Sequence, residues 1–274
     1  MVATVSSPPS VRSKALDDFG RGLRHWRLIG RMAWQQIRLR YARSLLGPFW
    51  MTLSMAAFCL AIGILFGAIL GMDLAAFLPY LTAGYTVWLL LSGVLTESTR
   101  LFLGWRPFIQ GSRLPYSFYV LAMVATHLIV FAHNMVVFVV VAAVYGSGPS
   151  PLQALMALAG LAVITVNALW VGLLLGMTCA RFRDFPEVIN IMLQILFFLT
   201  PIVWKPVRLP DNAFVDVLMT ANPFTHFVEI VRAPLLGGGA SLENWLVVAA
   251  VTVTGGVATT LLFDRYRARI LYWC

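Results

Sequence analysis

The chain has 274 residues, of which 60% are hydrophobic and only 11% are charged. Soluble domains usually carry about 25% charged residues, so this composition excludes an ordinary soluble domain and predicts an all-α integral membrane protein. The net charge of +9 comes from arginines that flank apolar segments, so membrane topology explains it without a nucleic-acid partner. Cys59, Cys179 and Cys274 are scattered along the chain and predict neither a metal site nor a disulfide framework.

The polar segment before residue 45 divides into two parts. Residues 1–18 are rich in Ser, Pro and charge, which predicts a flexible cytosolic tail. In residues 19–44 an apolar stripe and an arginine stripe lie side by side at the helical period of about 100° per residue. The apolar stripe contains Phe19, Leu23, Trp26, Gly30, Ala33 and Ile37, and the arginine stripe contains Arg24, Arg27, Arg31 and Arg38. The pattern predicts an amphipathic helix in the membrane interface, either as a plain anchor or with a further role.

Residues 45–274 predict a six-span transmembrane domain, because a spanning helix needs roughly 20 mostly apolar residues. The six segments cover about residues 48–70, 78–103, 117–145, 152–180, 187–204 and 244–263. Of the 20 Lys and Arg residues, 17 then fall on one side of the membrane, and Lys205, Arg208 and Arg232 fall on the other. The positive-inside rule therefore predicts a multi-pass protein with both termini in the cytosol.

The connection between the fifth and sixth spans, residues 205–243, is long and partly apolar. Two helix-like pieces, 211–220 and 223–236, are separated by Asn222-Pro223, and glycines follow at 237–239. Neither piece is long enough to cross a bilayer. We therefore expect re-entrant helices, which are tolerated where protein or a cavity covers the broken backbone.

The fifth span carries a stripe of Asn190, Gln194, Phe197 and Pro201 at the helical period. Amides can bond to hydroxyl groups and ring faces can pack against sugars, so this stripe suits a carbohydrate. Amide-mediated packing between helices is the equally weighted alternative. The neighbouring Phe198, with Tyr85 and Trp88 of the second span, completes the set of candidate lining residues, although interfacial belts explain most aromatic residues near span ends.

The sequence offers little catalytic chemistry. It contains no phosphate-binding loop of the P-loop type, and only two lysines are present. Glu97 and Arg100 are spaced to pair on one helix face. His127 and His133, both in the third span, are expected to hydrogen-bond to neighbouring helices. We predict no catalytic or metal site in this chain.

Three blocks in order, RYARSLLGPFW (40–50), RFRDFPEVINIMLQILFFLTPIVW (181–204) and NPFTHFVEIVRAPLLG (222–237), resemble the signature blocks of polysaccharide-exporting ABC transporter permeases. Within that family the similarity is closest to the O-antigen lipopolysaccharide exporters. Exporters of capsule and teichoic acid are near relatives. The resemblance covers nearly the whole chain.

The resemblance implies a homodimer in the bacterial inner membrane, together with two copies of a separate ATPase subunit that binds ATP and Mg. The dimer would enclose a channel for a polysaccharide linked to undecaprenyl pyrophosphate, and membrane lipids would surround it. No cofactor is expected in this chain itself. The broken helices after the fifth span would form a periplasmic gate that includes Asn222, Pro223, Phe224, His226, Glu229 and Arg232.

The junction RYARSLLGPFW would lie where the lipid-linked head enters, and its candidate binding residues are Arg40, Arg43, Leu46, Gly47 and Pro48. Pro48 suits the first position of a helix, and the positive end of that helix would face the headgroups. Arg40 lies off the arginine stripe, beside the apolar face. Guanidinium groups can bond to phosphate through two nitrogens, although plain contact with anionic headgroups is the alternative.

The cytosolic link 104–116 is the expected docking shelf for the ATPase, with Arg106, Pro107 and Arg113 as coupling residues. A plain loop is the alternative.

Two other functions of the protein stay open. One is a small-lipid or drug exporter of the same superfamily, and the other is a membrane transferase acting on a lipid-linked sugar through His127 or His133. A purely structural anchor fits the arginines and broken helices poorly.

Overall fold

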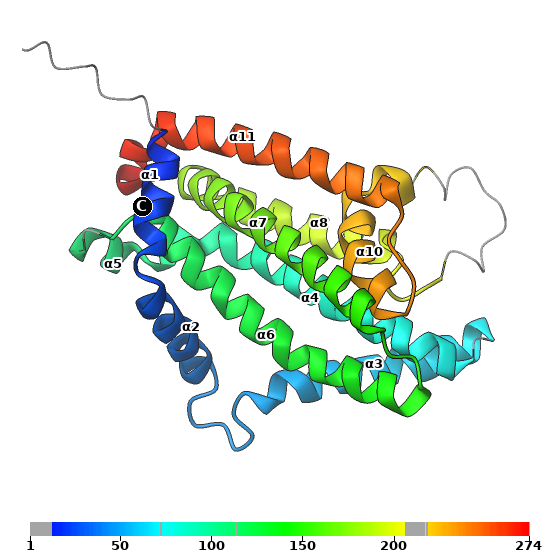
Figure 1. The fold of residues 1–274 in the computed structure, drawn as a ribbon. Coiled ribbons are helices and arrows are strands. Elements are labelled where there is room, and N and C mark those ends of the chain that lie inside the picture. Colours follow the sequence, from blue (N-terminus) through cyan, green and yellow to red (C-terminus); the bar gives the residue numbers. More distant parts are fainter. Residues whose placement is uncertain (1–12, 72, 113, 206–216, 218, 274) are drawn as a thin grey trace, which may run out of the picture.

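A computed structural model of the chain describes residues 13–71, 73–112, 114–205, 217 and 219–273. All of its regular elements are helices, which confirms the all-α prediction for the described part of the chain. In chain order they are α1 (Lys14–Leu23), α2 (Trp26–Arg40), α3 (Phe49–Leu70), α4 (Leu74–Gly104), α5 (Arg106–Gly111), α6 (Tyr116–Tyr145), α7 (Pro151–Arg181), α8 (Phe185–Leu199), α10 (Pro223–Leu235) and α11 (Leu242–Trp273) (Figure 1).

Five helices in the described residues, α3, α4, α6, α7 and α11, are long and apolar enough to cross a membrane. The predicted fifth span is shorter than expected, because α8 has only 15 residues. At a rise of 1.5 Å per residue it is about 22 Å long, against a hydrocarbon core of about 30 Å. Pro201 contributes to the early end of α8, since proline cannot donate to the helical ladder.

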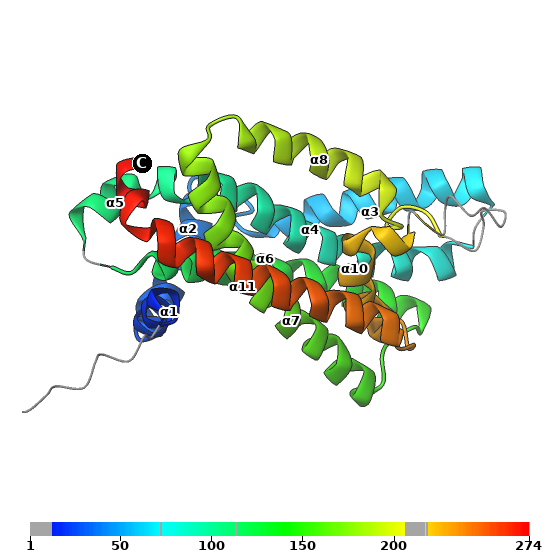
Figure 2. The ribbon, with the colours of Figure 1, turned by 90° about the horizontal axis from the view of Figure 1, so that it is seen from above.

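Helix α4 forms the centre of the bundle. In its most apolar stretch 61% of the residues are buried inside the protein, against 17% to 33% in the other four long helices. It packs against α6 and α7 over most of its length, and also against α3, α8 and α10. Seen from above, α8 lies on the outer side of the bundle and runs along α4 (Figure 2). Both α4 and α8 therefore present side chains to the same outer surface.

The amphipathic segment differs from the single helix expected over 19–44. It forms two helices, α1 and α2, which are separated at Arg24 and His25. Of the predicted apolar stripe, Ala33 and Ile37 are buried with Ile29, and this face of α2 packs on α6. Trp26 is 65% exposed. Leu23 and Gly30 are exposed as well, so only the second half of the stripe is used for packing within the protein.

Helix α1 also begins earlier than the predicted end of the tail at residue 18. Asp18 is only 1% exposed, and its carboxylate accepts a 2.9 Å hydrogen bond from the Ser117 backbone N–H at the start of α6. The same carboxylate lies 3.0 Å from the Arg267 guanidinium of α11. The Asp264 carboxylate accepts from the Ala15 backbone N–H at 2.7 Å. These long-range bonds hold residues 14–18 in a helix, where local composition suggested a tail.

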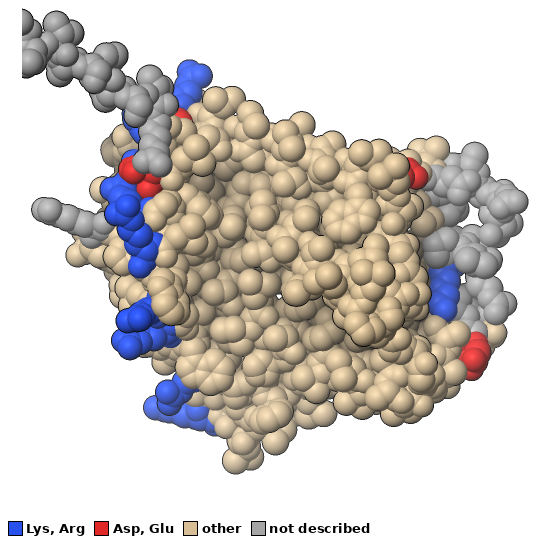
Figure 3. Space-filling view, in the orientation of Figure 1, with Lys and Arg blue, Asp and Glu red and all other residues tan. Residues whose placement is uncertain are grey.

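Charge is distributed unevenly over the molecule. In the view of Figure 3, Lys and Arg gather at the end of the bundle where α1, α2 and α5 lie, and the broad surface between the two ends carries neither sign of charge. The last turn of α11 lies at the same arginine-rich end (Figure 1). An uncharged surface of this width is what contact with the hydrocarbon of a bilayer requires.

Helix α10 lies crosswise at the opposite end of the bundle (Figures 1 and 2) and packs on α7, α11 and α4. Its 13 residues correspond to the second predicted short piece, 223–236. Most of the first piece, 211–220, lies outside the described residues.

Candidate functional site

A groove of about 700 Å³ opens along the outer surface where α3, α4 and α8 meet. Its lining includes all six predicted lining residues: Asn190, Gln194, Phe197 and Phe198 from α8, and Tyr85 and Trp88 from α4. Phe58 of α3 and Ser92, Thr96 and Glu187 complete its polar and aromatic lining. The helical period alone aligned the α8 residues, but only the packing of α8 against α4 brings the two sets together.

The aromatic part of the groove lies toward α10. The rings of Phe58 and Tyr85 stack with centroids 4.3 Å apart, and Phe197 contacts Trp88 at 5.7 Å. The Trp88 ring reaches Phe224 of α10 at 5.8 Å. Aromatic side chains therefore form a continuous contact between the groove and the crosswise helix.

The polar part of the groove lies toward the arginine-rich end. Within the described residues, the side-chain amides of Asn190 and Gln194 take part in no hydrogen bond, although both line the groove. Helix packing inside this chain therefore does not use them. Their donors and acceptors, with the carboxylate of Glu187, remain available to a polar molecule in the groove.

Pro201 does not continue the stripe, because α8 ends at Leu199. Residues 200–204 form a turn in which Thr200, Ile202 and Val203 are buried. The Pro201 carbonyl accepts a 2.8 Å hydrogen bond from the Tyr80 hydroxyl and a second bond from the Arg232 guanidinium. These donors satisfy a backbone carbonyl that the broken helix would otherwise leave unpaired in an apolar environment.

Arg232 of α10 is the largest fully buried side chain in the described residues. It pairs with Glu229 one turn away, and its guanidinium lies 4.1 Å above the Tyr80 ring. Although burial disfavours the charged form, the Tyr80 and Glu229 side chains hold the pKa of Arg232 above its ordinary value. A Cβ atom at Gly84 of α4 would lie only 3.1 Å from Arg232 Nη1. Gly84 thus leaves the space that the guanidinium occupies.

The other predicted gate residues also join separate elements. Asn222 caps α10 by accepting from the Phe224 backbone N–H at 3.0 Å, and its amide donates to Thr200 at 2.9 Å. His226 bonds to the Asn244 side chain at 2.7 Å and to the Thr220 carbonyl at 3.0 Å. Pro223 is the first residue of α10. The gate set therefore connects α10 to the turn after α8 and to the start of α11.

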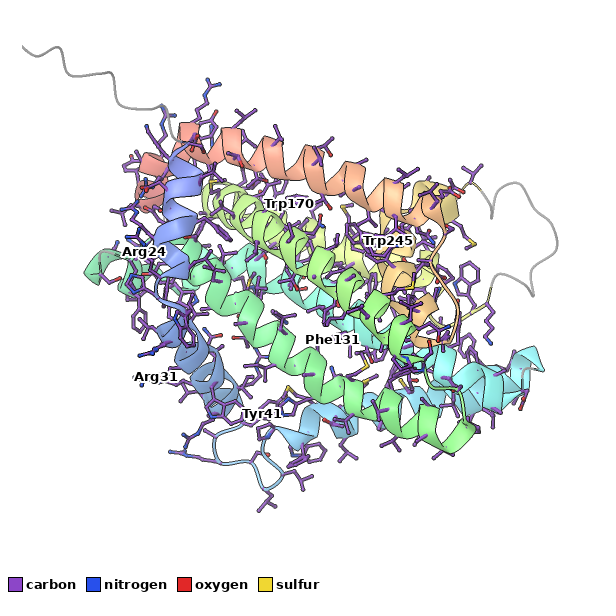
Figure 4. All side chains as sticks on the ribbon, viewed as in Figure 1. Arg24, Arg31, Tyr41, Phe131, Trp170 and Trp245 are labelled. Atoms are coloured by element: carbon purple, nitrogen blue, oxygen red, sulfur yellow. The ribbon has the colours of Figure 1, made fainter. Side chains whose placement is uncertain are left out.

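The junction between α2 and α3 contains a second pocket, of about 720 Å³. Of the predicted junction residues, Pro48 lines it, and its cations are Arg31 and Arg38 from the arginine stripe. Arg31 lies on α2, and Tyr41 is the residue that follows the end of this helix. Both lie at the edge of the molecule, where the chain turns toward α3 (Figure 4). The arginine stripe was the signal that would have identified these two cations.

The backbone of the junction is tightly turned. Gly47 has a φ of 55° and Arg43 has a φ of 67°, a region that side chains rarely adopt. Leu46 is 46% exposed. Pro48 stands immediately before the first residue of α3, one position earlier than expected. Its φ of −61° and ψ of −18° are already helical, so Pro48 leads directly into the first turn of α3.

Arg40 does not line the junction pocket. Its guanidinium points to α4, where Nη2 lies 3.5 Å from the Glu97 carboxylate. The same carboxylate lies 3.0 Å from Nε2 of His127 on α6. The predicted Glu97–Arg100 pair is therefore wrong: Glu97 joins α2, α4 and α6 instead.

The two histidines of α6 differ. His127 makes the predicted contact between helices, through its bond to Glu97. Its ring packs closely against Gly93 of α4, where an added Cβ atom would lie only 2.8 Å from the ring. His133 instead bonds to the Ile129 carbonyl of its own helix at 2.8 Å, so the prediction for His133 is wrong.

The expected coupling segment contains a short helix, α5, with Arg106 and Pro107 in its first turn. Arg113 lies outside the described residues.

Two curated proteins are similar to the chain. The O-antigen export system permease protein RfbA of Myxococcus xanthus is 21% identical over 234 residues, which are 85% of this chain and 90% of that protein. The protein of the same name from Klebsiella pneumoniae is 22% identical over 245 residues, which are 86% of this chain and 90% of that protein. The family model described as ABC-2 type transporter matches residues 27–236. That match covers most of the chain, which therefore belongs to the ABC-2 type transporters as one of their membrane subunits.

Proposed function

We propose that this protein is the channel-forming permease of an exporter that moves a lipid-linked polysaccharide, such as O-antigen on undecaprenyl pyrophosphate, across the bacterial inner membrane. The observation that carries the proposal is the groove between α3, α4 and α8, which combines unbonded amides with aromatic rings. A passing glycan needs such a surface, because hydroxyl groups bond to amides and sugar rings pack on aromatic faces. The two relatives named as O-antigen export permeases support the same substrate class.

A second copy of the chain would close the groove into a channel. The groove is open to the outside, and the exposed apolar side chains of Ile191 and Ile195 stand next to its lining residues Asn190 and Gln194 on α8. An apolar rim around a polar and aromatic groove suits contact with an identical surface. In this homodimer the arginine-rich end, with both termini, faces the cytosol.

ATP binding and hydrolysis belong to a partner in this proposal. The ABC-2 family implies an ABC ATPase partner, and the sequence contains no P-loop. Two copies of that subunit, each with ATP and Mg, would dock on α5 and the neighbouring ends of α1 and α2. The pyrophosphate head of the substrate would enter at the junction pocket, where Arg31 and Arg38 supply positive charge. Helix α10 and the turn 200–204 would serve as the periplasmic gate.

The experiment that tests this proposal replaces Asn190 and Gln194 with leucine in the full complex. We expect export of the glycan to fall, with lipid-linked glycan accumulating inside the cells, because the polar contacts in the groove are lost. Met192→Leu is the matched control, since Met192 is exposed on α8 but does not line the groove. Normal surface glycan in the double variant, or equal loss in the control, would refute a role of the groove in translocation.

Deletion of the gene distinguishes this function from its alternatives. An O-antigen exporter predicts loss of surface lipopolysaccharide O-chains, and an exporter of capsule or teichoic acid predicts loss of that polymer instead. A membrane transferase would keep its turnover without an ATPase and would lose it in His127→Ala or His133→Ala. Co-purification of the chain with a P-loop ATPase, and full export by both histidine variants, would exclude the transferase.

A further inference from the structure

A third pocket lies between the last turns of α7 and α11 and is separate from the groove and from the junction pocket. Its volume is about 170 Å³. Toward the middle of the bundle it is lined by Leu174, Met177 and Leu262, and toward the arginine-rich end by Arg181, Tyr266 and Trp273. The pocket therefore has an apolar inner part and a cationic, aromatic mouth.

Arg181 is the cation in this pocket. Its guanidinium carbon lies 5.0 Å from the Phe182 ring centroid and 5.4 Å from the Trp273 ring centroid. Among the described residues no carboxylate lies within ion-pair distance of Arg181, and no hydrogen bond occupies its guanidinium. The two rings therefore hold the side chain at the mouth while its five N–H donors stay available.

Two further arginines lie beside Tyr266, a residue that lines this mouth. Arg265 and Arg269 lie over the Tyr266 ring, with their guanidinium carbons 5.5 and 5.8 Å from its centroid, and that ring is 5.9 Å from Trp273. Neither arginine has an acidic partner in the described part of the chain. Their neighbour Arg267 does have one, since it pairs with Asp18. Uncompensated positive charge is thus concentrated at the pocket.

This combination matches one ligand class. Guanidinium groups bind phosphate oxygens through two parallel N–H donors, and Trp and Tyr concentrate at the level of lipid headgroups. Leu174, Met177 and Leu262 offer an apolar surface that a free phosphate does not need and an acyl chain does. We propose that this pocket is a binding site for an anionic membrane phospholipid, with its phosphate on Arg181 and the start of an acyl chain between α7 and α11.

The site has a consequence for the groove. Arg181 is the last residue of α7, and only three residues separate it from α8, which lines the groove. A lipid that holds Arg181 and Trp273 together would fix the direction in which the chain leaves α7. The proposed site therefore lies next to the segment that leads into the groove.

The test measures lipid bound to the purified full chain by native mass spectrometry. The chain is released from vesicles that contain equal amounts of phosphatidylglycerol and phosphatidylcholine. Wild-type protein is expected to retain phosphatidylglycerol, and Arg181→Gln is expected to retain roughly fivefold less, as the loss of one cation near a headgroup predicts. Arg181→Lys should lie between them, because lysine keeps the charge but lacks the two parallel N–H donors of the planar guanidinium. Phosphatidylcholine binding should be the same in all variants.

Arg27→Gln is the matched control. Arg27 also lies over an exposed ring, 5.3 Å from the centroid of Trp26, at the same end of the bundle, but it lines none of the three pockets. Equal loss of phosphatidylglycerol in Arg27→Gln and Arg181→Gln would overturn the site, since general attraction would then explain the binding. Undiminished phosphatidylglycerol in Arg181→Gln would also overturn it. Displacement of the lipid by excess inorganic phosphate would overturn the lipid part of the proposal, since the acyl chain would then add nothing to the binding.

Discussion

The guanidinium of Arg40 lies 3.5 Å from the carboxylate of Glu97, and this ion pair ties the last turn of α2 to α4. Arg40 is off the arginine stripe of α2 for this reason: its side chain serves an internal contact, whereas Arg31 and Arg38 face the junction pocket. Because His127 of α6 bonds to the same carboxylate, a movement of α2 would change contacts of both α4 and α6. The interface helix is thereby coupled to the helix that lines the groove.

This coupling predicts an energetic interaction between Arg40 and Glu97. A double-mutant cycle with Arg40→Ala and Glu97→Gln, followed by thermal unfolding in detergent, should give a coupling energy of about 0.5–1 kcal/mol. The value is small because Arg40 is about half exposed. Arg100→Ala serves as the control partner, since Arg100 makes no ion pair with Glu97 in the described residues. Additive effects of Arg40→Ala and Glu97→Gln would contradict the pair.

The junction pocket predicts which arginines matter for binding the substrate head. Arg31→Ala and Arg38→Ala should each lower the amount of exported glycan, because each removes one cation worth about 1 kcal/mol, or about fivefold in affinity for an anionic head. Arg43→Ala should have a smaller effect, since Arg43 does not line the pocket. Surface glycan on intact cells provides the measurement, with membrane insertion checked in parallel. A larger loss in Arg43→Ala than in Arg38→Ala would refute this ranking.

Arg232 predicts a strong effect on stability. Arg232→Met should lower the free energy of unfolding by about 3–5 kcal/mol, because Glu229 is left without its buried partner and the Pro201 carbonyl loses a donor. Thermal unfolding and dye leakage through reconstituted vesicles report on the fold and on the gate.

Two variants sharpen this test. Gly84→Ala should reproduce a milder form of the defect, since its methyl group would lie 3.1 Å from Arg232 Nη1. Arg269→Met is the control, because Arg269 forms no ion pair in the described part of the chain. If Arg232→Met and Arg269→Met unfold at the same temperature, the buried network does not stabilise the region.

Asp18 predicts how α1 is held. Asp18→Asn should loosen α1 by about 1–3 kcal/mol, because the Arg267 pair loses its negative charge and the Ser117 N–H keeps only a weaker acceptor. Faster hydrogen exchange over residues 14–23 is the expected signature. Asp17→Asn is a matched control, since Asp17 is 54% exposed and contacts only Arg21 of its own helix. Unchanged exchange in Asp18→Asn would show that other contacts dock α1.

A large part of the architecture could be predicted from the sequence because it depends on hydropathy and local period. The all-helical membrane class, four of the long helices within a few residues of their ends, the crosswise 223–236 piece and the α8 stripe all follow from apolar length or spacing. The fifth span was the exception. Its apolar run continues to Trp204, but proline and the donors of Tyr80 and Arg232 favour a buried turn after Leu199.

What the sequence by itself determined is the identity of the surfaces: which residues face lipid, which carry amides and rings, and where the arginines gather. The tertiary structure alone decided which of these residues meet. Arg40 with Glu97, Arg232 with Tyr80, and Asp18 with Arg267 each join residues that are far apart in the chain. Helical periodicity cannot specify such pairs, because it fixes the direction of a side chain around its own axis but not the neighbouring helix that the side chain contacts.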